Sequence, residues 1–144
     1  MKKVVFICRG NMFRSQVSEA FYNKYKKDDS LAVSCGTWVR TEGFEGRVLS
    51  SLVSVYPGIK HVFILMEEYE LDISASVCTQ ATNEFLKDAD KIVVMAERDF
   101  IPEWLNKFNY EYWEGIGNPD SLDKKTAENI IELIRIKVLK LLEN

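Results

Sequence analysis

The sequence is poor in the residues that carry disulfide, metal and triad chemistry. Its 144 residues include one histidine and three cysteines. The number of cysteines is odd, and Cys8, Cys35 and Cys78 show no CxxC spacing. This pattern indicates a protein of the reducing cytoplasm rather than a disulfide scaffold. The single histidine, His61, falls in a helical pattern, so neither a metal centre nor a Ser-His-Asp hydrolase is supported.

Long apolar runs and an excess of positive charge are also missing. The first apolar run, from Val4 to Cys8, stops at Arg9 and is too short for a signal peptide or a membrane span. The net charge of -3 gives no bulk attraction to nucleic acid or to an anionic membrane. A chain of this length with 47% apolar residues suits one domain, residues 1–144. We therefore expect a soluble cytoplasmic protein without nucleic-acid or membrane partners.

Strand-like and helical patterns alternate along the chain, which predicts the fold class. Helical patterns are expected at 15–27, 45–56, 60–70, 80–88 and 98–107, and at a last helix with an apolar stripe over 127–142. Buried strands are expected at 4–8, 31–36 and 91–96, with a weaker one at 110–113. This alternation predicts an α/β protein with a parallel sheet between helices, and ligands bind at the carboxyl ends of such strands. The segment 37–60 is expected to be an enlarged surface excursion.

The first strand ends in the loop "CRGNMFRS", residues 8–15, before a helix begins. Backbone N–H groups of a tight turn and the positive end of a helix dipole then point to one spot, which suits a tetrahedral oxyanion. Gly10 and Asn11 best tolerate the left-handed backbone that such a turn needs. The loop therefore predicts an anion cradle.

Three side chains of this loop suggest chemistry on a bound phosphoryl group. Arg14 offers a planar, two-pronged donor that suits two phosphate oxygens. Cys8 stands in the same positive field, which favours its thiolate, and Ser15 can donate a hydrogen bond to that sulfur. The alternative interpretation is a buried strand-end thiol and an ordinary surface arginine.

The stretch "CRGNMFRSQVSEAF" resembles the signature of the low-molecular-weight protein tyrosine phosphatases, roughly C-x-G-N-x-C-R-S-P-x-A-E. The matching residues are Cys8, Gly10, Asn11, Arg14, Ser15 and Glu19. "VSCGT" at 33–37, "LDISAS" at 71–76 and "DADKIVVMA" at 88–96 resemble later segments of the same family. The resemblance thus covers nearly the whole chain in order.

This resemblance implies a three-layer sandwich with a four-stranded parallel sheet, flavodoxin-like and of the phosphotyrosine phosphatase I type. It also implies phosphocysteine chemistry without a metal or another cofactor. Cys8 would attack phosphorus, and an aspartate would protonate the leaving oxygen. The phosphate-binding loop would be Arg9, Gly10, Asn11, Met12, Phe13, Arg14 and Ser15. The expected partner is a phosphotyrosine-bearing protein or a small aryl phosphate.

The sequence departs from the family pattern inside the loop. Phe13 replaces a second cysteine that many members carry, so a protective disulfide within the loop cannot form and over-oxidation of Cys8 should be less reversible. Gln16 replaces the usual proline at the helix start. Arg9 is interpreted either as a phosphate-steering charge on the rim or as a solvated side chain.

The general acid is less clear, because the family's Asp-Pro pair is replaced by "GNPDSLD" at 117–123. If Asn118 holds the place of the acid, activity should be weak, because an amide has no carboxyl proton to donate. If the loop is longer, Asp120 reaches the site, and this is the assignment we favour. Asp120 has the alternative role of a turn former, and Asp123 is a third candidate or a helix cap.

Among the aromatic residues near the expected pocket, Trp38 is the best candidate for a wall that stacks on a phenyl phosphate, because it follows the strand end "GT". Two other functions stay open. An arsenate reductase needs further cysteines close together to relay a disulfide, and only Cys78 is near the expected region. A phosphate-binding pseudo-phosphatase would keep the cradle without an acid.

Overall fold

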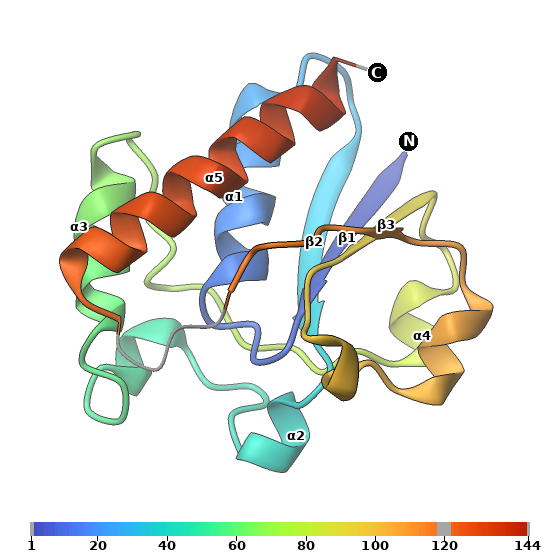
Figure 1. Cartoon of the computed structure of the whole chain (residues 1–144), viewed down its shortest axis with the longest axis horizontal. Coiled ribbons are helices and arrows are strands. Elements are labelled where there is room, and N and C mark those ends of the chain that lie inside the picture. The colour runs from blue at the N-terminus through green and yellow to red at the C-terminus, as the bar shows by residue number, and fades with distance from the viewer. Residues whose placement is uncertain (1, 118–121, 144) are drawn as a thin grey trace.

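The computed structural model describes residues 2–117 and 122–143, and these residues form one parallel sheet with helices on both faces (Figure 1). The sheet that they build has four strands in the order β2-β1-β3-β4, with every neighbouring pair parallel. The strands are β1 (Lys3–Cys8), β2 (Leu31–Gly36), β3 (Lys91–Val94) and β4 (Glu111–Tyr112). The expected fold class, a three-layer α/β sandwich, is confirmed.

The central strand β1 explains why the sheet is covered on both sides. Its residues from Val4 to Cys8 are all buried, and alternate side chains enter different cores. Val4, Phe6 and Cys8 belong to one hydrophobic cluster. Val5 and Ile7 belong to the other. A consecutive apolar run is what a strand with two buried faces requires.

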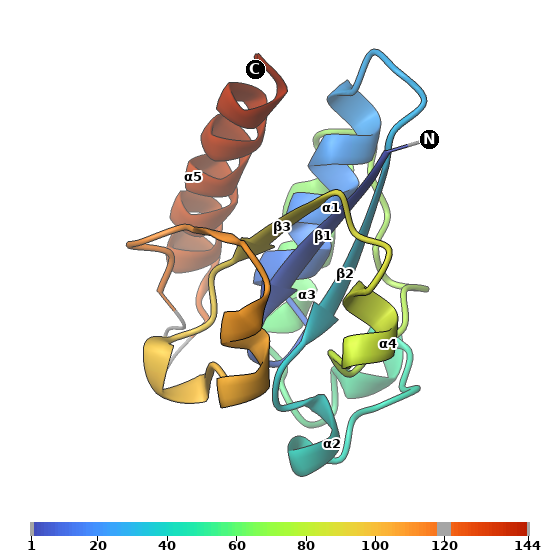
Figure 2. The same cartoon turned by 90° about the vertical axis from the view of Figure 1, so that its right-hand side faces the viewer.

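Two groups of helices supply these cores (Figure 2). The face of Cys8 is covered by α1 (Arg14–Tyr25), α3 (Ile59–Glu67) and α5 (Lys124–Leu142). The other face is covered by α4 (Asn83–Leu86) and by the 3-10 helix η3 (Glu103–Lys107), which the 3-10 helix η2 (Arg98–Phe100) precedes. None of the helices within residues 2–117 and 122–143 has the length and apolar character needed to cross a membrane.

Three helix predictions are wrong in extent. The predicted helix 45–56 contains the short 3-10 helix η1 (Leu49–Leu52), and the helix α2 (Val39–Glu42) precedes it. The predicted helix 98–107 is divided into η2 and η3 because Pro102, between them, has no backbone N–H to continue a helix. The predicted helix 80–88 shrinks to α4, whose start is set by Thr82, since its side chain accepts a hydrogen bond from Phe85 N.

The segment 37–60 lies largely at the surface, as expected, but several of its apolar residues anchor it in the core. Val39, Leu49, Leu52 and Ile59 are all buried within the cluster that contains Cys8. Its backbone also bonds to the chain before α4, with Leu49 N donating to Ser76 O at 2.9 Å. The apolar residues of this segment pack into the tertiary core without following a helical repeat. Their spacing in the sequence therefore does not predict their positions.

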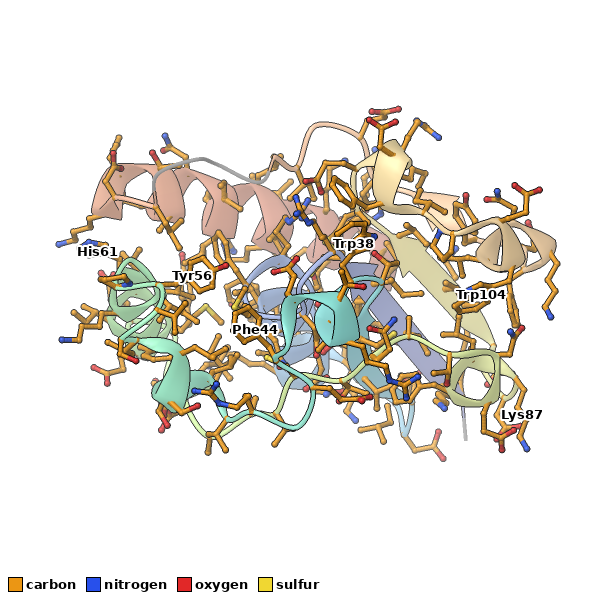
Figure 3. The ribbon with its side chains drawn as sticks, turned by 90° about the horizontal axis from the view of Figure 1, so that it is seen from below. Trp38, Phe44, Tyr56, His61, Lys87 and Trp104 are labelled. Atoms are coloured by element: carbon orange, nitrogen blue, oxygen red, sulfur yellow. The ribbon has the colours of Figure 1, made fainter. Side chains whose placement is uncertain are left out.

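The carboxyl ends of the strands meet at one edge of the sheet, at the bottom of Figure 1. Figure 3 shows this edge from below, with α2 in front. The loop 9–13 after β1 and the start of α1 lie at this edge, which is where parallel sheets bind ligands. The fold therefore brings the predicted anion cradle to a suitable position.

Candidate active site

The loop between β1 and α1 is held in place by the end of β2. Cys8 is the last residue of β1 and pairs with Gly36, the last residue of β2. A Cβ atom added to Gly36 would lie 2.7 Å from Arg9 O and 2.9 Å from Asn11 N. The backbone of the loop therefore rests directly on Gly36, and only glycine leaves room for this approach.

Asn11 organises the interior of the loop. It is fully buried and has a φ of 54°, in the left-handed region that asparagine tolerates better than most residues. Its Nδ2 donates to Ser15 Oγ at 2.7 Å and to Ser34 Oγ at 3.0 Å, and its Oδ1 accepts from Thr79 N at 2.9 Å. The expected left-handed turn is thus found at Asn11, whereas Gly10 does not adopt a positive φ, so the expectation for Gly10 is wrong.

The sulfur of Cys8 lies among donors. Asn11 N donates to Cys8 Sγ at 3.2 Å, and Ser15 Oγ lies 3.0 Å from the same sulfur. Ser15 Oγ accepts from Asn11 Nδ2, which leaves its own proton available for donation to the sulfur. α1 begins just beyond, with Phe13 at the N-cap position and no side-chain cap within the described residues. N–H groups of an uncapped first turn suit an anion.

The structure adds residues that sequence reasoning missed. Gln16, which replaces the family's proline, is buried, and its Nε2 donates to Asn11 O at 3.2 Å and to Val77 O at 3.1 Å. Thr79 and Ser34 complete the bonds of Asn11. The signals for Gln16 and Ser34 were their places in the two resembling segments, but their partners are far away in sequence and only the fold identifies them.

Arg14 is buried and reaches the ends of distant segments. Its Nη1 donates to Met95 O at 2.9 Å and to Ile116 O at 3.1 Å, and its Nη2 donates to Glu97 Oε1 at 2.8 Å. These bonds use three of the five N–H groups of a guanidinium. Arg14 therefore couples the loop of Cys8 to the end of β3 and to the chain that precedes residue 118.

Glu97 is the carboxylate partner of this buried arginine. Burial alone raises the pKa of a carboxyl, but the charge and the hydrogen bond of Arg14 outweigh it and hold the pKa of Glu97 below its ordinary value. Glu97 is therefore an anion at neutral pH and a poor candidate for a general acid. Its position suits it to orient Arg14.

A cavity of about 340 Å³ opens over the loop, and Cys8, Gly10 and Arg14 are among the residues that line it. Met12 and Phe13 also line it, so most of the predicted phosphate-binding residues face one space. Asn11 and Ser15 are not among the described lining residues, since both are fully buried behind the loop.

Arg9 lies on the rim of this cavity and has fixed partners. Its Nε donates to Glu42 Oε1 at 3.2 Å, and its guanidinium lies 3.8 Å from the ring centre of Phe100 and 5.5 Å from that of Trp38. The sequence allows Arg9 to be either a rim residue or a solvated side chain, and the structure places it on the rim. Its charge is paired there with Glu42.

Trp38, the predicted pocket wall, packs elsewhere. Its ring meets Phe100 edge to face at 4.8 Å, and it is not among the described residues that line the cavity. Val55, Tyr56 and Pro57 form a wall instead, which sequence reasoning did not anticipate because they belong to the segment expected to be an excursion.

Asp120 and Asn118, the two candidates for the acid position, lie outside the described residues. Asp123 is described, and its Oδ1 accepts from Thr126 N at 2.8 Å, so it caps α5. Leu122 lines the cavity and lies against Gly58, where an added Cβ would be 2.5 Å from Leu122 O. This contact fixes the start of α5 beside the pocket.

The other cysteines are buried. Cys35 belongs to the core on the opposite face of the sheet from Cys8, and burial raises its pKa. Burial, together with the charge of Cys8, raises the pKa of Cys78 to about 11. Both thiols are therefore weak nucleophiles at neutral pH. In the described part of the chain, no group of three or more His, Cys, Asp or Glu side chains is placed to hold a metal ion.

A parallel α/β fold with a cysteine at the base of a loop that leads into a helix N-terminus defines a class of proteins whose site suits a tetrahedral oxyanion. The family described as low molecular weight phosphotyrosine protein phosphatase matches residues 3–144, and the chain belongs to this family. Family membership supports a cysteine-based phosphatase or arsenate reductase.

Individual relatives represent both activities. The chain is 25% identical over 146 residues to the glutaredoxin arsenate reductase of Synechocystis sp., covering 100% of this chain and 95% of that protein. It is similar to the low molecular weight protein tyrosine phosphatase of T. tengcongensis, with a TM-score of 0.74 and 26% identity over 99% of each chain. Vibrio vulnificus Wzb in complex with benzylphosphonate shares the fold, with a TM-score of 0.79 and 18% identity over 99% of this chain and 97% of that one.

Replacing Gly36 by alanine should damage the loop through its backbone. The new Cβ would overlap Arg9 O and Asn11 N, so the loop must move, at a cost of about 1–3 kcal/mol as in other overpacked sites. We expect a lower midpoint of thermal unfolding and weaker binding of inorganic phosphate by calorimetry. Cys35→Ala, on the same strand but in the other core, is the control and should lower stability while phosphate affinity stays unchanged. Equal phosphate affinity in Gly36→Ala and the wild type would contradict this account.

Glu97→Gln should loosen Arg14. Because the folded-state pKa of Glu97 is lowered, its ion pair stabilises the protein above the ordinary carboxyl pKa of 4.5 and is lost as pH falls below that value. The difference in stability between wild type and Glu97→Gln should therefore be largest near neutral pH and shrink in acid. Glu114→Gln, which removes the exposed pair with Arg98, is the control and should show little effect. A pH-independent difference for Glu97→Gln would rule out the ion pair as its source.

Proposed function

We propose that the protein is a phosphomonoester hydrolase, namely a protein-tyrosine phosphatase that works through a phosphocysteine. The observation that carries the proposal is the environment of Cys8 Sγ, which accepts from Asn11 N at 3.2 Å and lies 3.0 Å from Ser15 Oγ. Two donors at one sulfur stabilise a thiolate. That thiolate faces a cavity that Arg14 also lines.

The roles follow from these positions. The Cys8 thiolate attacks phosphorus and forms a thiophosphate bond, while the bond to the leaving oxygen breaks. The loop N–H groups and Arg14 stabilise the charge on the phosphoryl oxygens. Ser15 donates again when the thiolate leaves during hydrolysis. The phosphoryl group is released as inorganic phosphate after attack by water.

We assign the general acid to Asp120. It stands two residues before Leu122, which lines the cavity, so a short chain separates it from the site. Asn118 beside Pro119 is the alternative occupant of the acid position, and in that case the protein is a weak enzyme or a phosphate-binding pseudo-phosphatase. A phosphotyrosine-bearing protein or a small aryl phosphate is the proposed substrate, and the cytoplasm is the proposed location.

Arsenate reduction is the second candidate, because a named glutaredoxin arsenate reductase is similar over the whole chain. Arsenate is a tetrahedral oxyanion that suits the same loop. Its reduction to arsenite needs a second thiol, either of the protein or of glutathione, that attacks the arsenic-bearing sulfur and forms a disulfide. Cys35 lies in the opposite core, and the raised pKa values of Cys35 and Cys78 make both poor attackers. These features favour the phosphatase.

The two activities can be separated with purified protein. We expect turnover of para-nitrophenyl phosphate that is lost in Cys8→Ser, while that variant still binds vanadate because Arg14 and the loop N–H groups remain. Cys78→Ala should keep the phosphatase activity. Arsenite formation from arsenate with glutathione and glutaredoxin, lost in Cys8→Ser and exceeding ester hydrolysis, would instead establish the reductase.

The acid assignment has its own test. Asp120→Asn should slow an aryl phosphate with a poor leaving group by about 10²–10⁴-fold, the usual contribution of general acid catalysis. The loss should be smaller for a good leaving group, which needs less protonation, and Asn118→Asp should change little. The pseudo-phosphatase predicts the reverse, namely a silent Asp120→Asn and a gain of activity in Asn118→Asp. Steady-state kinetics on both substrates distinguish these outcomes.

A further inference from the structure

The connection between β2 and α3 carries a wall of the cavity that opens over Cys8. Val55, Tyr56 and Pro57 all line that cavity, and Tyr56 and Val55 stay 44% and 50% exposed. Exposed apolar side chains that face a cavity are available to a ligand. The rest of this connection is anchored in the core through Leu49 and Leu52, so the wall has a fixed base.

Tyr56 is held although its ring is half exposed. Its backbone N–H donates to Leu52 O at 2.8 Å, and its carbonyl accepts from Ile59 N at 3.0 Å. Its ring meets Phe44 edge to face, with 5.8 Å between ring centres. Phe44 is itself buried, so the tyrosine ring rests against a rigid surface. A pre-positioned aromatic ring loses little conformational freedom when it stacks on a ligand.

The chemistry of the cavity is divided between its base and its wall. Cys8 and Arg14 supply the anion-binding base, whereas Phe13 and Tyr56 supply aromatic surface. A phosphate monoester bound at the base directs its leaving group away from Cys8, into a space with two rings and further apolar side chains. A flat aromatic leaving group fits this division better than a small one, and the charged Glu42, which also lines the cavity, is already paired with Arg9.

Trp38 and Tyr56 occupy separate parts of the same edge of the sheet. Figure 3 shows Tyr56 near Phe44 and on the side of His61 of α3, with Trp38 away from that pair. The ring of Trp38 is engaged by Phe100 at 4.8 Å and by the Arg9 guanidinium at 5.5 Å. Trp38 therefore supports the rim, and its ring is already used.

We propose that Tyr56 is the specificity-determining residue that selects an aromatic group on the phosphate, in the role that the sequence suggested for Trp38. As a statement about substrate choice, this proposal rests on the proposed phosphatase function. The preference for an aromatic group can be measured by binding alone. Tyr56 contacts the leaving group and takes no part in the transfer of the phosphoryl group.

Binding measurements test the proposal without requiring turnover. The dissociation constants of benzylphosphonate and methylphosphonate are measured by calorimetry for wild type, Tyr56→Ala, Tyr56→Leu and Tyr56→Phe. We expect Tyr56→Ala and Tyr56→Leu to lose about threefold to tenfold in affinity for benzylphosphonate, the range of one aromatic contact, with methylphosphonate unchanged. Tyr56→Phe keeps the ring and should keep the wild-type preference. Ile64→Ala, which alters an exposed α3 residue outside the described lining, is the control.

Kinetics separate this proposal from the proposed function. With para-nitrophenyl phosphate and acetyl phosphate as substrates, Tyr56→Ala should lower the ratio of their kcat/KM values through KM, with kcat little changed. If wild type hydrolyses neither ester but Tyr56→Ala still loses benzylphosphonate affinity, the phosphatase function fails and the role of Tyr56 stands. An unchanged preference in both Tyr56→Ala and Tyr56→Leu overturns the proposal, as does a loss found in Trp38→Ala instead.

Discussion

The left-handed turn at Asn11 is the constraint on which the site depends. At a φ of 54°, this residue reverses the chain after Cys8 so that its own N–H points at the Cys8 sulfur. Such a backbone is unfavourable for most residues, and here the side-chain bonds to Ser15, Ser34 and Thr79 offset the cost. Those bonds also leave the proton of Ser15 for the sulfur, so one buried amide both shapes the loop and arranges its electrostatics.

Arg14 connects this arrangement to two other segments at the same edge of the sheet. Its guanidinium bonds to two carbonyls and to Glu97, which come from the ends of β3 and of the chain before residue 118. A buried cation needs such partners, since an unpaired charge in the core would be costly. The same bonds place Arg14 beside the cavity. The partners that stabilise its buried charge therefore also set its position for a ligand.

The cavity joins segments that are distant in the chain. The loop 9–13 provides its base, the connection 55–59 provides an apolar wall, and Leu122 lines it next to Gly58. Family membership supports cysteine-based chemistry, whereas the choice between phosphate ester and arsenate depends on the second thiol. Our proposal of ester hydrolysis draws on the place of Cys35 in the opposite core and on the burial that raises the pKa of Cys78.

The sequence by itself determined the parallel α/β fold, the strand-loop-helix unit around Cys8 and the central place of Arg14. These are local: a run of apolar residues makes a strand buried on both faces, and a short loop must bring Cys8 and the start of the helix together. Only the tertiary structure decided that Glu97 pairs with Arg14, that Gln16 ties the loop to Val77, and that Tyr56 rather than Trp38 lines the cavity. The two hydrogen bonds join residues more than 60 positions apart, and the cavity collects residues from separate segments. No local pattern encodes such packing in three dimensions.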